Sequence, residues 1–129
     1  MKTIKGPAIF LAQFADDQAP FNNLKNICQY MADLGYKGVQ IPSWDPRMID
    51  LQKAAESKTY ADEIAGIVEE TGMQITELST HLQGQLVAVH PAYNELFDGF
   101  APASLKGDLK GKTEWATQQL MYAAKASNN

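Results

Sequence analysis

The 129 residues carry a net charge of −4 and have the length of a single domain that can bury a moderate core. Apolar residues make up 45% of the chain and charged residues 20%, as in ordinary globular proteins. The acidic balance argues against nucleic-acid and membrane-surface partners, because both of these need clustered basic residues.

The start of the chain superficially resembles a signal peptide, but its apolar run is short and is interrupted by Gly6, Pro7 and Gln13. We therefore expect a first strand there, and nowhere does a run approach the ~20 apolar residues of a membrane span. The single cysteine, Cys28, has no internal disulfide partner and falls on the apolar face of a predicted helix, where packing is its expected role. Together these features predict a cytoplasmic protein.

The first strand is predicted over residues 8–14, a near-continuous apolar run that is entered through Pro7. Such runs are typical of strands that are buried on both faces of a parallel sheet. Gln13 lies at the carboxyl end of this strand. Asp16 and Asp17 follow in a segment that is either a solvated turn or part of a site.

A first helix comes next, since apolar residues recur at helical spacing between a capping asparagine (Asn22 or Asn23) and the stop signal Gly35. Residues 36–41 then form a short second strand, which Pro42 ends.

Trp44 stands in the loop after the second strand, and Gln40 near the end of that strand is expected to point into the same space. The indole ring could stack on the C–H face of a sugar or plug the mouth of the sheet, and the residues alone leave both interpretations open.

The third strand opens the most informative stretch, residues 74–91, which reads QITELSTHLQGQLVAVHP. It begins with apolar and β-branched residues and ends in polar ones, among them His81 and Gln85 on either side of Gly84. Loops that leave the carboxyl ends of parallel strands are where ligands bind. This stretch therefore forms either one wall of a polar small-molecule site or an ordinary surface loop.

The remaining segments are predicted from helical spacing and turn residues. They are a short helix over residues 48–56, a longer helix from Ser57 or Thr59 to Thr71 with Gly72 as its stop, a helical turn over residues 91–97, a long loop over residues 98–112, and a last helix from Thr113.

Strands and helices alternate three times, which predicts one α/β domain over residues 1–129, with parallel strands joined by right-handed crossovers. Three such units do not close a sheet, so the first and third strands should be open edges. We expect another copy of the chain, or a further C-terminal part, to cover these edges.

Three segments carry a resemblance to a known family: GPAIFLAQF, LGYKGVQIPSWD and ITELSTHLQGQLVAVHPAYNELFDGFAP. Together they resemble the sugar phosphate isomerase/epimerase family, whose members are xylose-isomerase-like TIM barrels. The resemblance extends over essentially the whole chain. It implies a partial barrel that corresponds to the N-terminal three of about eight βα units.

The resemblance also implies proton transfer next to a sugar carbonyl, assisted by a divalent metal ion such as Mn²⁺, Mg²⁺, Co²⁺ or Zn²⁺. The family takes its main metal ligands from its C-terminal half, so we expect this chain alone to bind no metal and to be inactive. His81 matches a histidine that contacts sugar oxygen in relatives and is the expected catalytic residue; in the endonuclease-IV branch a histidine there ligates zinc. Trp44, Gln13, Gln40 and Gln85 are carried over as substrate-binding positions at strand ends.

His90 matches no family position firmly, and packing against Pro91 is its expected role. Glu77 lies on the third strand, but alternation does not place it at the mouth.

The first hypothesis for the function is a sugar isomerase or epimerase that acts, in its complete form, on a sugar or sugar phosphate. The alternative is a non-catalytic half-barrel that self-associates or pairs with a C-terminal half. An endonuclease-IV-like phosphodiesterase needs more histidines and a basic face.

Overall fold

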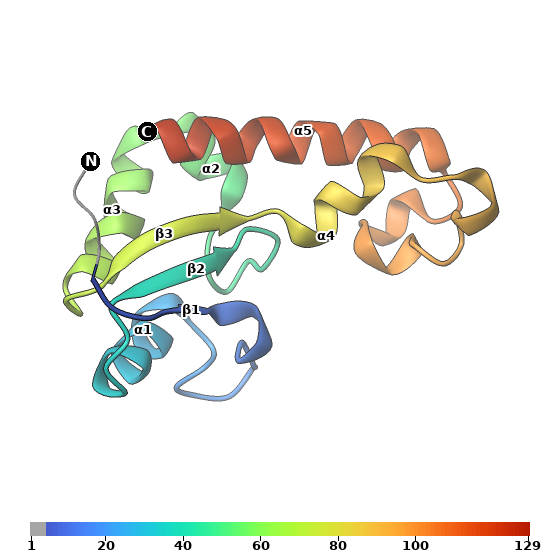
Figure 1. The fold of residues 1–129 in the computed structure, drawn as a ribbon. Helices are drawn as coiled ribbons and strands as arrows, with labels where there is room; N and C mark the ends of the chain where they lie inside the picture. The colour runs from blue at the N-terminus through green and yellow to red at the C-terminus, as the bar shows by residue number, and fades with distance from the viewer. Residues whose placement is uncertain (1–4) are drawn as a thin grey trace.

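A computed structural model describes residues 5–129, which form a small α/β fold around a three-stranded sheet (Figure 1). Strands β1 (Ala8–Phe10), β2 (Gly38–Pro42) and β3 (Gln74–Ser79) are all parallel and lie in the order β1-β2-β3. Within these residues the outer edges of β1 and β3 carry no further strand. The predicted alternation of strands and helices is confirmed.

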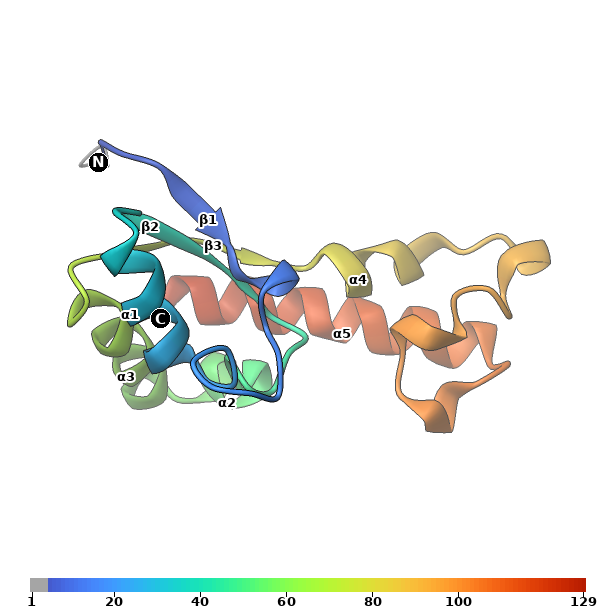
Figure 2. The same ribbon diagram turned by 90° about the horizontal axis from the view of Figure 1, so that it is seen from below.

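The helices lie on one side of the sheet. α1 (Leu24–Asp33) follows β1, and α2 (Leu51–Glu56) and α3 (Lys58–Glu69) follow β2. Figure 2 shows these three helices and the C-terminal α5 (Leu109–Asn128) in one layer beside the strands. The fold therefore has two layers, with helices on one face of the sheet only.

At α1 and at the end of α3, the structure uses the helix signals that the sequence predicts. Asn23 caps α1, because its side-chain oxygen accepts a hydrogen bond of 2.9 Å from the Asn26 backbone N–H. Gly35 and Gly72 follow α1 and α3 with φ values of 96° and 78°, a left-handed conformation that glycine adopts without steric cost.

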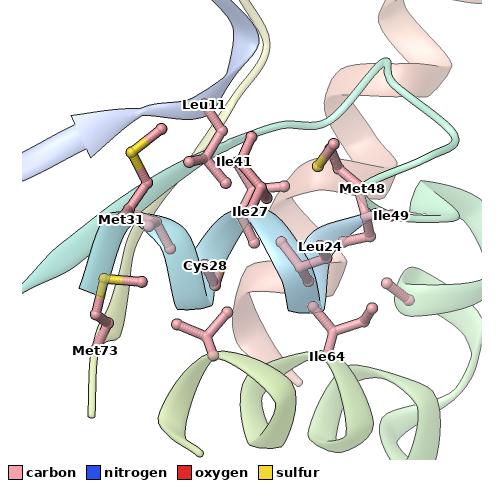
Figure 3. Packing of buried hydrophobic residues seen from close by; sticks show 13 residues of the cluster. Leu11, Leu24, Ile27, Cys28, Met31, Ile41, Met48, Ile49, Ile64 and Met73 are labelled. Carbon is pink, nitrogen blue, oxygen red and sulfur yellow. The ribbon is translucent and has the colours of Figure 1, made fainter. Parts of the chain in front are cut away.

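The core lies between the sheet and these helices (Figure 3). Val39 and Ile41 of β2 are fully buried against an α1 face that includes Ile27 and Cys28. Burial raises the pKa of the Cys28 thiol to about 12, because the thiolate loses its hydration there. The expected packing role of this cysteine is therefore confirmed.

A bulge in β3 changes which side chains face the core. Val39 is paired with Ile75 but Gln40 with Glu77, so Thr76 is an extra residue in β3, and its hydroxyl donates to the Val39 carbonyl oxygen at 3.1 Å. Side chains in a regular strand alternate between faces. The bulge lets Ile75 and Leu78, three positions apart, both pack against the core.

The expectation that the first strand is buried on both faces is wrong. Ala8 is exposed and Phe10 is only partly buried, because the described helices cover just one face of the sheet. The strand is also shorter than residues 8–14, since Leu11–Gln13 leave it as a turn of 3-10 helix, η1.

Residues 85–108 form an arm that projects beyond the carboxyl ends of the strands (Figure 1). It follows the short helix α4 (His81–Gly84) and is made of single turns of 3-10 helix. These turns are η2 (Gln85–Ala88), η3 (Pro91–Tyr93), η4 (Asp98–Phe100) and η5 (Ala103–Leu105).

The long helix α5 runs back from the arm and packs on α2. It begins at Leu109 rather than at the expected Thr113, because Asp108 caps it through a 2.9 Å hydrogen bond from the Gly111 N–H. None of the helices in residues 5–129 is both long and apolar enough to cross a membrane.

Candidate functional site

A hollow of about 490 Å³ opens on the uncovered face of the sheet, toward the carboxyl ends of the strands. Phe10, Gln40 and Glu77 form one row across it, because the strand register pairs them with one another on β1, β2 and β3. The rest of its wall comes from the end of β3 and from α4 with the residue that follows it. These residues are Ser79, Thr80, His81, Gly84 and Gln85. We call this space the polar hollow.

Three buried polar residues brace the strand ends beneath the hollow. The Ser43 N–H and hydroxyl donate to the Ser79 carbonyl oxygen at 3.0 and 2.8 Å. Since its proton is used there, the Ser43 oxygen accepts from the Gln83 side-chain amide at 3.1 Å. Gln83 is 0% exposed and its Oε1 has no hydrogen-bond partner within residues 5–129. The brace ties α4, and with it His81, to the ends of β2 and β3.

Trp44 and His81 lie close together although they come from different βα units. The centroids of their rings are 6.5 Å apart, and the Trp44 ring lies 6.1 Å from Phe10 in an edge-to-face arrangement. His81 is exposed and Trp44 is partly buried. The indole therefore stands beside the polar hollow with one part of its surface open to a ligand.

The other residues singled out in the sequence divide into two groups. Gln40 and Gln85 line the polar hollow, and the Gln85 amide is held by a 3.1 Å hydrogen bond to the His81 carbonyl oxygen. Gln13 does not line it and is exposed at the end of η1. His90 lies in the arm, where its Nδ1 accepts from the Ala92 N–H at 3.2 Å and caps η3.

Glu77 is a residue of the hollow that sequence reasoning missed. Simple alternation along β3 gave no firm side for its carboxylate, whereas the bulge at Thr76 sets it opposite Gln40 on the open face. The spacing of Ile75 and Leu78 was the signal in the sequence that could have indicated the bulge. Two core residues three positions apart in a short strand require one residue out of register.

A charged cluster holds the loop after β2 near the same end of the sheet. The Arg47 guanidinium donates to both carboxylate oxygens of Asp45, at 2.9 and 2.7 Å, and to Asp17 in the loop after η1 at 2.7 Å. These hydrogen bonds from Arg47 hold the pKa of the Asp45 carboxyl below its usual range, against the opposing effect of burial. The Asp17 side chain is 93% exposed, so this ion pair lies in a solvated turn, as one of the two interpretations from the sequence expected.

The metal ion that the family resemblance implies does not fit the residues described. Residues 5–129 bring together no group of three histidine, cysteine, aspartate or glutamate side chains. Glu77 and His81 are the two side chains of these types in the polar hollow. Divalent metal sites in proteins use more ligands than this pair provides.

Comparison with known proteins adds no assignment, since no family model matches this chain and no curated protein matches it.

Proposed function

We propose that this chain is the N-terminal part of a sugar isomerase or epimerase of the xylose-isomerase-like TIM-barrel type. In this proposal the polar hollow holds a hydroxylated sugar or sugar phosphate. One observation carries it: His81, Gln40 and Gln85, three of the residues expected at strand ends, line one hollow, with the Trp44 ring 6.5 Å from His81.

The hollow offers the groups that a sugar needs. A neutral imidazole has one N–H donor and one acceptor nitrogen, so His81 can donate to a carbonyl oxygen or accept from a hydroxyl. The Gln40 amide offers both kinds of group, and the Glu77 carboxylate accepts from hydroxyls. A donor held against a sugar carbonyl stabilises the charge that develops on its oxygen when a neighbouring proton is removed.

No step of this proposal runs through a metal ion. The resemblance assigns the ligands of a divalent ion to strands beyond this chain, and the side chains described do not supply a set. What these residues would contribute is the binding and orientation of the sugar. We expect the short chain to bind sugar weakly and to lack turnover.

The two histidines provide a direct test, because the chain contains only His81 and His90. In a titration with D-xylose, D-fructose and D-fructose 6-phosphate, we expect the His81 ring signals in an NMR spectrum to move and those of His90 to stay. His81→Asn should abolish the response, and the matched variant His90→Asn should keep it. Equal responses from both rings, or none from His81, would contradict the proposal.

A second function, assembly through the open edge of β3, is favoured by a separate feature. A groove of about 350 Å³ runs between β3, α3 and the end of α5, and much of its lining is apolar. An unpaired strand edge beside apolar surface can accept another strand, from a second copy or from a C-terminal half.

Light scattering tests this assembly. Ala65→Glu in the groove should give monomers, whereas the exposed Ala124→Glu should leave any dimer intact. A wild-type chain that is monomeric at high concentration contradicts self-association.

A further inference from the structure

A second hollow, of about 530 Å³, lies between the loop after β2, the arm and α5. Its walls include Trp44 and Trp115, the two tryptophans of the chain, together with Phe100 and Leu82. We call it the aromatic hollow. These residues come from four separate segments, so the fold as a whole, rather than a single loop, shapes this space.

Trp44 connects the aromatic hollow with the polar hollow. It lines the aromatic hollow, while its ring lies 6.1 Å from Phe10 and 6.5 Å from His81, which both line the polar hollow. On the other side of the boundary, His81 lines the polar hollow and Leu82, the next residue, lines the aromatic hollow. The two hollows are therefore neighbours, separated by the indole of Trp44 and the start of α4.

The charges around the hollows argue against a phosphorylated ligand. The charged residues in their linings are Glu77 in the polar hollow and Asp50 in the aromatic hollow, and no lysine or arginine of the described chain lines either. Phosphate sites in proteins are built from arginine, lysine or the N-terminus of a long helix. Carboxylates placed there repel phosphate instead.

We infer that the substrate is an uncharged disaccharide, with its reducing ring, which opens to supply the carbonyl of the proposed reaction, in the polar hollow and its second ring in the aromatic hollow. This inference rests on the proposed function, and it narrows the substrate from any sugar or sugar phosphate to a neutral molecule of two rings. The face of an aromatic ring and the C–H face of a sugar both pack well on indole. The volume of the aromatic hollow lies within the range of known small-molecule sites.

The test compares ligands that differ in one part. D-glucose supplies the reducing ring alone, cellobiose adds a second sugar ring, and D-glucose 6-phosphate adds a phosphate. We expect cellobiose to bind about tenfold more tightly than D-glucose, and the phosphate to weaken binding. NMR follows the two indole N–H signals, and the Trp115 signal should move only with cellobiose.

Two variants test the aromatic hollow separately. Trp115→Leu should remove the tenfold gain of the second ring and leave the affinity for D-glucose unchanged, which also shows that the variant is folded. Ala101→Phe, which fills the aromatic hollow from the arm, should do the same. Gln118→Leu, at an exposed position of the same helix, is the matched control and should keep the gain.

The outcomes separate this inference from the proposed function. Equal affinity for one-ring and two-ring ligands, with His81 responding to both, overturns the inference and leaves the proposed function standing. A response of Trp115 without any response of His81 overturns both, because no sugar then occupies the polar hollow. Tighter binding of D-glucose 6-phosphate than of D-glucose overturns the requirement for a neutral ligand.

Discussion

The sheet region and the arm reach a fixed structure by different means. The sheet and α1–α3 close over an apolar core in which Val39, Ile41 and Ile27 are fully buried. The centre of the arm is charged instead. Lys112 of α5 is 0% exposed, and its ammonium group donates to the Asn94 carbonyl oxygen at 2.7 Å and to the Asp98 carboxylate.

The two residues that bind the Lys112 ammonium group, Asn94 and Asp98, both also hydrogen-bond to the backbone of Gly107. Asp98 accepts a hydrogen bond of 2.9 Å from the Gly107 N–H, and the Asn94 side chain donates to the Gly107 carbonyl oxygen at 2.9 Å. Gly107 has a φ of 76°, which other residues adopt only with strain. Apolar packing therefore fixes the sheet region by volume, whereas the part of the arm beyond the buried Leu86 depends on a few hydrogen bonds with exact partners.

The largest effect is expected where volume is lost from the core. Ile41→Ala should lower the free energy of unfolding by about 2–5 kcal/mol, because it removes buried contacts and leaves a cavity. Leu96→Ala in the arm is the control: Leu96 is 73% exposed, so its truncation should change stability by no more than about 0.5 kcal/mol. Urea unfolding measures both, and similar losses would show that the arm shares the apolar core.

An intermediate effect is expected at the brace that joins β2, β3 and α4. Ser43→Ala should lower the free energy of unfolding by about 1–3 kcal/mol, because the amide of Gln83 then stays buried without its acceptor. The exposed Ser104→Ala is the matched control. In a double-mutant cycle, Gln83→Leu should cost much less in the Ser43→Ala background than in the wild type. Strictly additive losses would contradict the brace.

The two regions also differ in how far the sequence predicts them. The sheet region follows from apolar spacing and from stop signals such as Gly35 and Gly72, since burial imposes a period on the chain. The arm has no such period: its order comes from partners far apart in sequence, such as Asp98 with Lys112. A lysine among polar residues gives no sign that it will be fully buried.

The candidate site shows the same limit at a single residue. His81, Gln40 and Gln85 could be placed from their positions at strand ends, because parallel strands finish at one edge of a sheet. Gln13 does not line the hollow, since β1 ends at Phe10 and Leu11–Gln13 form η1. Glu77 was missed because the bulge that turns it toward the hollow depends on pairing with β2.

A smaller and local effect is expected when the buried charge of the arm is removed. Lys112→Met keeps most of the side-chain volume but leaves Asp98 without its ammonium partner, so the arm should open more often while the sheet stays folded. Limited proteolysis should then cut residues 90–108 faster, and amide exchange in β2 should be unchanged. Lys110→Met, whose side chain is exposed on the same helix, is the control. Faster exchange in β2 as well would mean that the arm and the sheet unfold together.

The smallest effect is expected from acid, and it should reach the two regions separately. The hydrogen bonds from Arg47 lower the pKa of Asp45, and the pKa of Asp98 is lowered by the Gly107 N–H first and then by Lys112. Because both pKa values lie below that of an unfolded aspartate, near 3.9, the stability they contribute is complete above about pH 5. It is lost as the pH falls through the lowered values.

Two substitutions divide this acid effect between the regions. Asp45→Asn should flatten the acid dependence of the stability of the sheet, which is measured by the exchange of β2 amides. Arg47→Met should flatten it in the same way. Asp98→Asn should flatten only the acid dependence of cleavage in the arm by pepsin, an acid-active protease. If Asp98→Asn altered the profile of β2 as much as Asp45→Asn does, the charges of the arm would be coupled to the sheet. The contrast between the two regions would then be one of composition alone.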